Sequence, residues 1–164
     1  MKNSTKKPLV PFPIHKLTSH FSNSIIVVCN APACQGEEMV GFIREDNYQY
    51  AGRHVLIDLY GCYDIDDPER IKILLSDICK NLGATVLYSY AHEFDGGGSS
   101  GVIILAESHC TWHHWLSEGY IALDIFVCGN CQPQDALDDL ITMFKPTRHE
   151  LNLVKRGTMP LIST

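Results

Sequence analysis

Two amphipathic segments, each with one apolar stripe, constrain the fold of this chain more than any other feature. The first begins at Asp67 and Pro68, a capping side chain followed by proline at the first helical position, and Gly83 is placed to end it. The second begins at Pro133 and stops before Pro146. Their apolar residues recur at helical spacing: Ile71, Leu74, Leu75, Ile78 and Leu82, then Ala136, Leu137, Leu140, Ile141 and Phe144. Each stripe must be buried against another layer, so both helices are expected to cover a sheet.

Segments rich in β-branched and apolar residues flank these helices and are expected to form strands. They span residues 54–60, 84–90, 102–106, 120–127 and 149–154. The order is strand, helix, three strands, helix, strand, so each half pairs a helix with strands on either side. We therefore expect an α/β (α+β) fold: a two-layer sandwich with a mostly antiparallel sheet, helices on one face and an internal pseudo-duplication. The other face would be open or covered by a partner.

The chain is expected to divide near residue 50. Residues 1–50 form an N-terminal extension whose first 22 residues, with three prolines and little periodicity, are predicted to be flexible. An edge strand at 25–28 is the only element that the rest of the extension suggests. Residues 51–164 are expected to form one domain, long enough to bury a core.

Composition excludes several classes of function. The formal charge of −6 argues against a nucleic-acid or anionic-membrane surface, because both require basic patches. No apolar run reaches the roughly 18 residues of a membrane helix, and no apolar segment follows the Lys-rich start as in a signal peptide. A cytoplasmic protein is therefore expected, in which most of the seven cysteines are free, buried thiols.

Four polar groups could carry chemistry. Glu107-Ser108-His109 follows an apolar strand, and His113-His114 comes shortly after it. Cys128-Gly129-Asn130-Cys131 comes immediately after a later strand, and Phe94-Asp95 precedes three glycines. Each has an ordinary structural explanation, since a Ser-His pair at a strand end is usually a solvated turn. A single Cys-x-x-Cys is also weak evidence for zinc, because a structural site needs four ligands.

Two alternatives for the cysteine pair remain open from the residues alone. Cys128 and Cys131 could complete a zinc site with His109 and His113, in a binding module that is not an enzyme. Redox use would need the pair to open a helix, and a helix does begin nearby at Pro133.

A series of short motifs also occurs in the order and spacing of one known family. They lie at 52–54, 58–62, 83–86, 92–94, 100–102, 106–109, 119–120, 124–129 and 155–157. On these motifs the chain resembles the short prokaryotic S-adenosylmethionine decarboxylase proenzymes from about residue 52 to residue 157. The resemblance is specific because Ser100, Glu107-Ser108-His109 and Cys128-Gly129 must keep fixed separations.

The resemblance implies a proenzyme that cuts itself between Glu107 and Ser108. In the family the serine attacks the preceding carbonyl, and acyl shift, β-elimination and hydrolysis leave a pyruvoyl group. Carried over, Ser108 becomes that pyruvate-derived cofactor and forms a Schiff base with the substrate amine, an electron sink like that of PLP. Ser100 and His113, the proton acceptor, match the processing residues. Cys128 matches the proton donor, which must begin as a neutral thiol.

The substrate motifs match less well. Phe94 matches the aromatic residue expected to stack on adenine, and Trp115 is retained. Ser117, however, stands where a ribose-binding glutamate is expected, and the neighbouring Glu118 would point away on a strand-like path. Asp95 could instead meet a cationic side chain.

The resemblance therefore favours S-adenosylmethionine decarboxylation in polyamine biosynthesis, with ornithine or arginine decarboxylation as the alternative. It also implies a small amino-acid-type substrate, no metal, and a homodimer of cleaved protomers in which both contribute to each active site.

Overall fold

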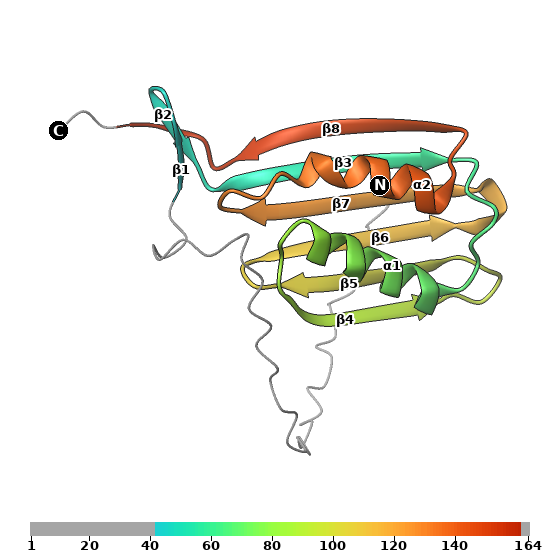
Figure 1. The fold of residues 1–164 in the computed structure, drawn as a ribbon. Helices are drawn as coiled ribbons and strands as arrows, with labels where there is room; N and C mark the ends of the chain where they lie inside the picture. Colours follow the sequence, from blue (N-terminus) through green and yellow to red (C-terminus); the bar gives the residue numbers. More distant parts are fainter. Residues whose placement is uncertain (1–41, 162–164) are drawn as a thin grey trace, which may run out of the picture.

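The computed structural model describes residues 42–161, which form two antiparallel sheets and two α-helices (Figure 1). The small sheet has the order β1-β2-β9, formed by Ile43–Glu45, Tyr48–Tyr50 and Met159–Pro160. The large sheet has the order β4-β5-β6-β7-β3-β8, formed by Val86–Glu93, Ser99–Leu105, Ser108–Trp115, Tyr120–Cys128, Gly52–Tyr60 and Arg148–Arg156. All of its neighbouring strands are antiparallel.

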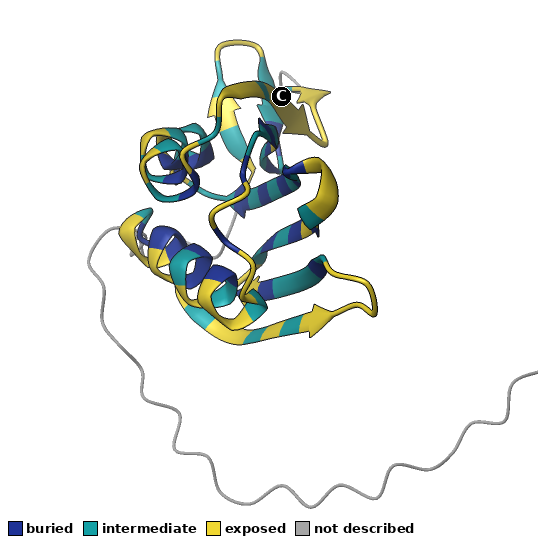
Figure 2. Ribbon diagram, turned by 90° about the vertical axis from the view of Figure 1, so that its right-hand side faces the viewer, coloured by how far each residue is buried: buried dark blue, intermediate teal, exposed yellow. Residues whose placement is uncertain are grey.

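Helices α1 (Pro68–Asn81) and α2 (Leu137–Phe144) cover the same face of the large sheet (Figures 1 and 2). The Asp67 side chain caps α1 by accepting a hydrogen bond from the Glu69 N–H at 2.9 Å, as the sequence predicts. The core between the layers is built from the apolar stripes and the inward residues of the strands: Val55, Ile57, Leu59, Ile103, Trp112, Ile121, Ile125, Ile71, Leu75, Ile78, Leu140 and Phe144. Within residues 42–161, neither helix has the length and apolarity needed to span a bilayer.

The opposite face of the large sheet, which we call the open face, is not covered by any described element. Directly opposed residues share a face of a sheet, so the strand register identifies its members. It exposes several large apolar side chains: Leu56, Tyr88, Tyr90, Ile104, Trp115 and Val154. The functional residues considered below lie on this face or at its two ends.

The structure confirms the predicted fold class and corrects some elements. Strand β6 was not predicted, because its alternating inward residues include His114 among the apolar ones. The β1–β2 hairpin within the N-terminal extension was also missed. The second helix begins with a 3-10 turn at Pro133–Ala136 before α2. The predicted flexible leader and the strand at 25–28 lie outside the described residues.

Candidate active site

Ser108 is the first residue of β6, directly after a tight turn from β5. Leu105 and Ser108 are opposed in the register, so the turn consists of two residues, Ala106 and Glu107. Glu107 has φ +67°, a left-handed conformation that tight turns normally give to glycine. The bond proposed for cleavage therefore follows a residue held in an unfavourable backbone conformation.

Cys128, the last residue of β7, lies beside Ser108 because β6 and β7 run antiparallel. Its backbone N–H donates to Ser108 Oγ at 3.2 Å. Burial, with a smaller contribution from the charge of Glu107, raises the pKa of the Cys128 thiol, and a hydrogen bond with Ser108 opposes this only in part. The thiol is therefore protonated at neutral pH, as a proton donor must be.

Ser100 and His113 form a second group on the open face. They are opposed on β5 and β6, and Ser100 Oγ and His113 Nδ1 share a hydrogen bond of 2.6 Å. The ring of Trp115 lies 5.8 Å from that of His113, and Phe94 lies in the turn that leads into β5. The neighbouring His114 points inward, and burial lowers its pKa, so it is a core histidine.

The two groups lie at opposite ends of β6. His113 is five positions beyond Ser108 on this strand, which at about 3.3 Å per residue separates them by roughly 16 Å. One protomer therefore brings Ser100 to His113 and Cys128 to Ser108, but does not join the two pairs. A hollow of about 280 Å³ next to His113 is lined by Leu56, Ile57, Asp58, His113, Ala122, Leu123 and Asp124.

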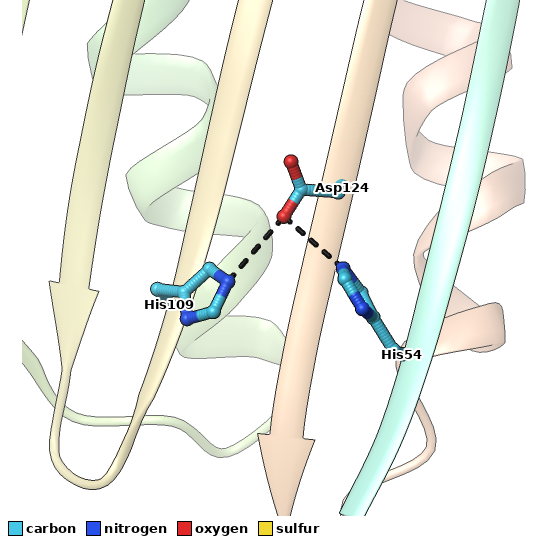
Figure 3. A group of neighbouring side chains, drawn as sticks. All are labelled: His54, His109 and Asp124. Atoms are coloured by element: carbon cyan, nitrogen blue, oxygen red, sulfur yellow. Dashed lines mark hydrogen bonds and ion pairs between the residues drawn. The ribbon is translucent and has the colours of Figure 1, made fainter. Parts of the chain in front are cut away.

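A trio of polar side chains, in which two histidines contact one aspartate, joins three strands of the open face (Figure 3). Nε2 of His54 and Nε2 of His109 lie 3.2 and 3.4 Å from Asp124 Oδ1. Arg156 Nη1 lies 2.9 Å from His54 Nδ1, and a guanidinium can only donate, so the proton of His54 must be on Nε2. That nitrogen then donates to Asp124 and has no lone pair for a metal, although the three residues have ligand-like spacing. Thr111 donates to the other carboxylate oxygen.

The zinc-module alternative is not supported by this geometry. His109 and His113 are four positions apart on one strand, about 13 Å at 3.3 Å per residue. Two ligands of one zinc ion must each lie about 2.0–2.3 Å from the metal. The two histidines therefore cannot bind one ion within a protomer.

The expectation that Glu118 points away from position 117 is wrong. Residues Leu116–Glu118 form a 3-10 turn, in which neighbouring side chains do not alternate between opposite faces. The Ser117 hydroxyl donates to the Glu118 carboxylate, so this carboxylate reaches the side of Ser117. Asp95 is exposed in the turn between β4 and β5.

Sequence reasoning assigned no role to Asp124, His54 or Arg53. Asp124 is the acceptor of the trio, and Arg53 Nη1 donates to the carbonyls of Gly129 and Cys131 at 3.2 and 3.3 Å. For His54 and Asp124 the available signal was that polar residues alternate with apolar ones along their strands, which marks a face with polar partners.

The chain is similar to known proteins in sequence and in fold. The family model described as S-adenosylmethionine decarboxylase matches residues 53–157. An S-adenosylmethionine decarboxylase proenzyme from Methanococcus maripaludis is 36% identical over 109 residues, which cover 65% of this chain and 89% of the relative. One from Persephonella marina is 38% identical over 113 residues, 67% and 85% of the two chains.

A solved structure also matches. The crystal structure of the adenosylmethionine decarboxylase from Aquifex aeolicus VF5 superposes with a TM-score of 0.64 at 32% identity, covering 70% of this chain and 98% of that one. Sequence and fold thus point to the same family. The resemblance seen in the sequence is confirmed, and the chain belongs to the S-adenosylmethionine decarboxylase family, whose members are carboxy-lyases.

Proposed function

We propose that this chain is a self-processing, pyruvoyl-dependent decarboxylase of S-adenosylmethionine that acts in the cytoplasm. The observation that carries the proposal is the arrangement at the start of β6. There Ser108 follows the left-handed Glu107, its Oγ accepts the Cys128 N–H, and the Cys128 thiol is kept neutral. The names of the relatives supply the substrate.

The residues around Ser108 fit a pyruvoyl group at this position. Ser108 is half-buried at a strand end, next to a backbone donor and a protonated thiol. When present, the group supplies an electron sink that lets a carboxylate leave as CO2. Cys128 then holds the proton that must be delivered to the substrate carbon.

Strain at Glu107 would assist the cleavage that creates the group. Ser108 Oγ is the nucleophile, and the Glu107 carbonyl is the group it attacks. A left-handed conformation costs a residue with a side chain roughly 1–2 kcal/mol, and breaking the 107/108 bond releases it.

Replacing Glu107 with glycine is expected to slow self-cleavage about tenfold, since removing about 1.4 kcal/mol of strain raises the barrier by that amount. The measurement is the time course of fragment formation by intact mass after synthesis in a cell-free system. Glu107→Gln is the control, because it keeps the strain and removes only the charge. Equal rates for the glycine variant and the parent would contradict a role for strain.

We further propose that the active enzyme is a homodimer packed through the open face. In one protomer the Ser100–His113 pair and the Ser108–Cys128 pair are at opposite ends of β6. A twofold axis parallel to the sheet, lying between the two open faces and crossing the middle of β6 at a right angle, would place each pair opposite the other pair of a second copy. The exposed apolar side chains of the open face support burial of this kind.

The same packing would place the substrate residues of one copy at the Ser108 of the other. Phe94 and Trp115 lie at the Ser100–His113 end and offer aromatic faces for a nucleobase. Glu118 offers a carboxylate for the ribose hydroxyls from its position beside Ser117.

Release of CO2 from carboxyl-labelled S-adenosylmethionine, ornithine and arginine by purified protein tests the function. We expect fragments of 107 and 57 residues, the smaller with a blocked N-terminus, and turnover of S-adenosylmethionine alone. Turnover of only ornithine or arginine would replace the proposed substrate, with Asp95 as the first residue to test as the partner of a cationic side chain.

Replacing Glu118 with glutamine is expected to raise the KM for S-adenosylmethionine about 30-fold with little change in kcat. Hydrogen bonds from hydroxyls to a carboxylate are worth about 2 kcal/mol. The ribose does not react, so this contact stabilises the bound substrate and the transition state equally, and its loss raises KM without changing kcat. Steady-state kinetics measure it. Ser117→Ala, which removes only the neighbouring hydroxyl, should change KM much less, and an unchanged KM in Glu118→Gln would exclude the ribose contact.

A further inference from the structure

Arg53, at the start of β3, holds the turn that follows Cys128. Its side chain is only 11% exposed, and its Nη1 donates to the carbonyl oxygens of Gly129 and Cys131 at 3.2 and 3.3 Å. These carbonyls lie on either side of Asn130. A nearly buried guanidinium needs hydrogen-bond acceptors. Because Arg53 donates to both carbonyls, it fixes the backbone path of the turn.

Glu45, on β1, in turn holds Arg53. Its Oε1 lies 3.7 Å from Arg53 Nη2 and accepts from the Tyr50 hydroxyl at 2.6 Å. Its Oε2 accepts from the Tyr48 hydroxyl at 2.7 Å and from Lys155. Hydrogen bonds from Lys155, Tyr50 and Tyr48, in that order, lower the pKa of Glu45 to about 2, so the carboxylate is charged throughout the neutral range.

These contacts form a continuous series from the hairpin to Ser108. Glu45 contacts Arg53, Arg53 bonds the turn at residues 129–131, and Cys128, immediately before the turn, donates its N–H to Ser108 Oγ. In Figure 1 the β1–β2 hairpin lies at the end of the large sheet where β7 and β8 finish and β3 begins. The family match begins at residue 53, so Glu45 belongs to a segment outside the matched domain.

We propose that the β1–β2 hairpin is a clamp on the active-site turn, in which Glu45 and Arg53 act as positioning residues that present Cys128 to Ser108. The proposal rests on the roles proposed above for Ser108 and Cys128. Neither Glu45 nor Arg53 would touch the substrate. Their effect would be on where the backbone N–H and the thiol of Cys128 stand.

The test compares Glu45→Gln, Arg53→Lys and the control Asp77→Asn, which likewise neutralises a carboxylate but breaks an exposed contact with Lys80 on α1, away from the open face. Lysine keeps the charge of Arg53, but it has a single nitrogen and so cannot bond the two carbonyls from one atom and face Glu45 from another, as Nη1 and Nη2 do. Self-cleavage is followed by intact mass. In a second series, every variant also carries Ser108→Ala, and alkylation of Cys128 at pH 8.5 is followed by peptide mass, which requires no cleavage and no activity.

We expect Glu45→Gln and Arg53→Lys to slow self-cleavage about tenfold, because slight misplacement of a reacting group has an effect of this size. In the second series, the same two changes should speed alkylation of Cys128 several-fold. Cys62, Cys79 and Cys110, which are buried, should stay protected, and Asp77→Asn should match the parent. Parent-like cleavage and alkylation in both variants would overturn the clamp while leaving the proposed function intact. A lowered Tm with all cysteines reactive would overturn it in favour of a purely structural role.

Failure of the proposed function itself would look different. In that case the parent would not be cut at 107/108, whereas the alkylation series would still report whether Glu45 and Arg53 hold the turn.

Discussion

Replacing Ser108 with alanine is expected to leave a single chain of 164 residues, where the parent gives fragments of 107 and 57 residues. The physical reason is that the Ser108 hydroxyl, directly after the strained turn and next to the Cys128 N–H, is the proposed nucleophile. Loss of the nucleophile removes covalent catalysis altogether, so no cleavage is expected on the time scale of purification. Intact mass under denaturing conditions measures it directly.

Ser108→Cys is the matched control for this experiment. A thiol at the same position is still a nucleophile, so slow cleavage at the same bond is expected, with a cysteine-derived new terminus. Ser108 is half-buried, and alanine fits its space without a cavity, so the alanine variant should keep the Tm of an uncut chain. Cleavage of the alanine variant at 107/108 would mean that another group attacks the bond.

Mixing two inactive variants is expected to restore cleavage if the site forms between copies. His113→Ala alone should cut about a hundredfold more slowly, the usual loss of a general base. Co-expressed with Ser108→Ala, however, the His113→Ala chain keeps its own Ser108 and can receive His113 from the other copy. Its cleavage should therefore return, while the Ser108→Ala chain stays whole, and tags of different mass distinguish the two chains.

The control for this mixture is a partner that carries both Ser108→Ala and His113→Ala. It assembles in the same way but cannot supply His113, so cleavage of the His113→Ala chain should stay slow. Rescue by this double variant, or no rescue by Ser108→Ala, would contradict the shared site. Ser108 and His113 are far apart along β6 within one copy, so rescue would show that His113 of one copy acts on Ser108 of the other. A measurement of oligomeric state alone would not show which residues meet.

Local signals predicted much of the fold. The Asp67-Pro68 cap and the apolar stripes placed both helices, and runs of β-branched residues placed five strands. Strand β6 was not predicted because its inward residues include the polar Ser108 and His114 beside Cys110 and Trp112, so no clear apolar pattern stands out. The hairpin at β1–β2 was missed because three-residue strands give almost no periodic signal.

The candidate site was predicted residue by residue but not as an arrangement. Motif spacing singled out Ser100, Ser108, His113 and Cys128, yet only the register of β5, β6 and β7 shows which of them are neighbours. Arg53 and Glu45 could not be found in this way, because their contacts join positions 76 and 8 residues apart through tertiary packing.

The strand order of the large sheet also determines whether the two products of cleavage stay associated. Cutting after Glu107 leaves β3, β4 and β5 in one product and β6, β7 and β8 in the other, and the order interleaves them. β3 is hydrogen-bonded on one side to β7 and on the other to β8, while β5 is bonded to β6. Strands of the two products are thus hydrogen-bonded to each other at several places in one sheet, and the products should stay associated on dilution. Once unfolded, the two products must associate in order to refold, so refolding becomes a bimolecular reaction. The mature form therefore persists only while its two chains stay associated.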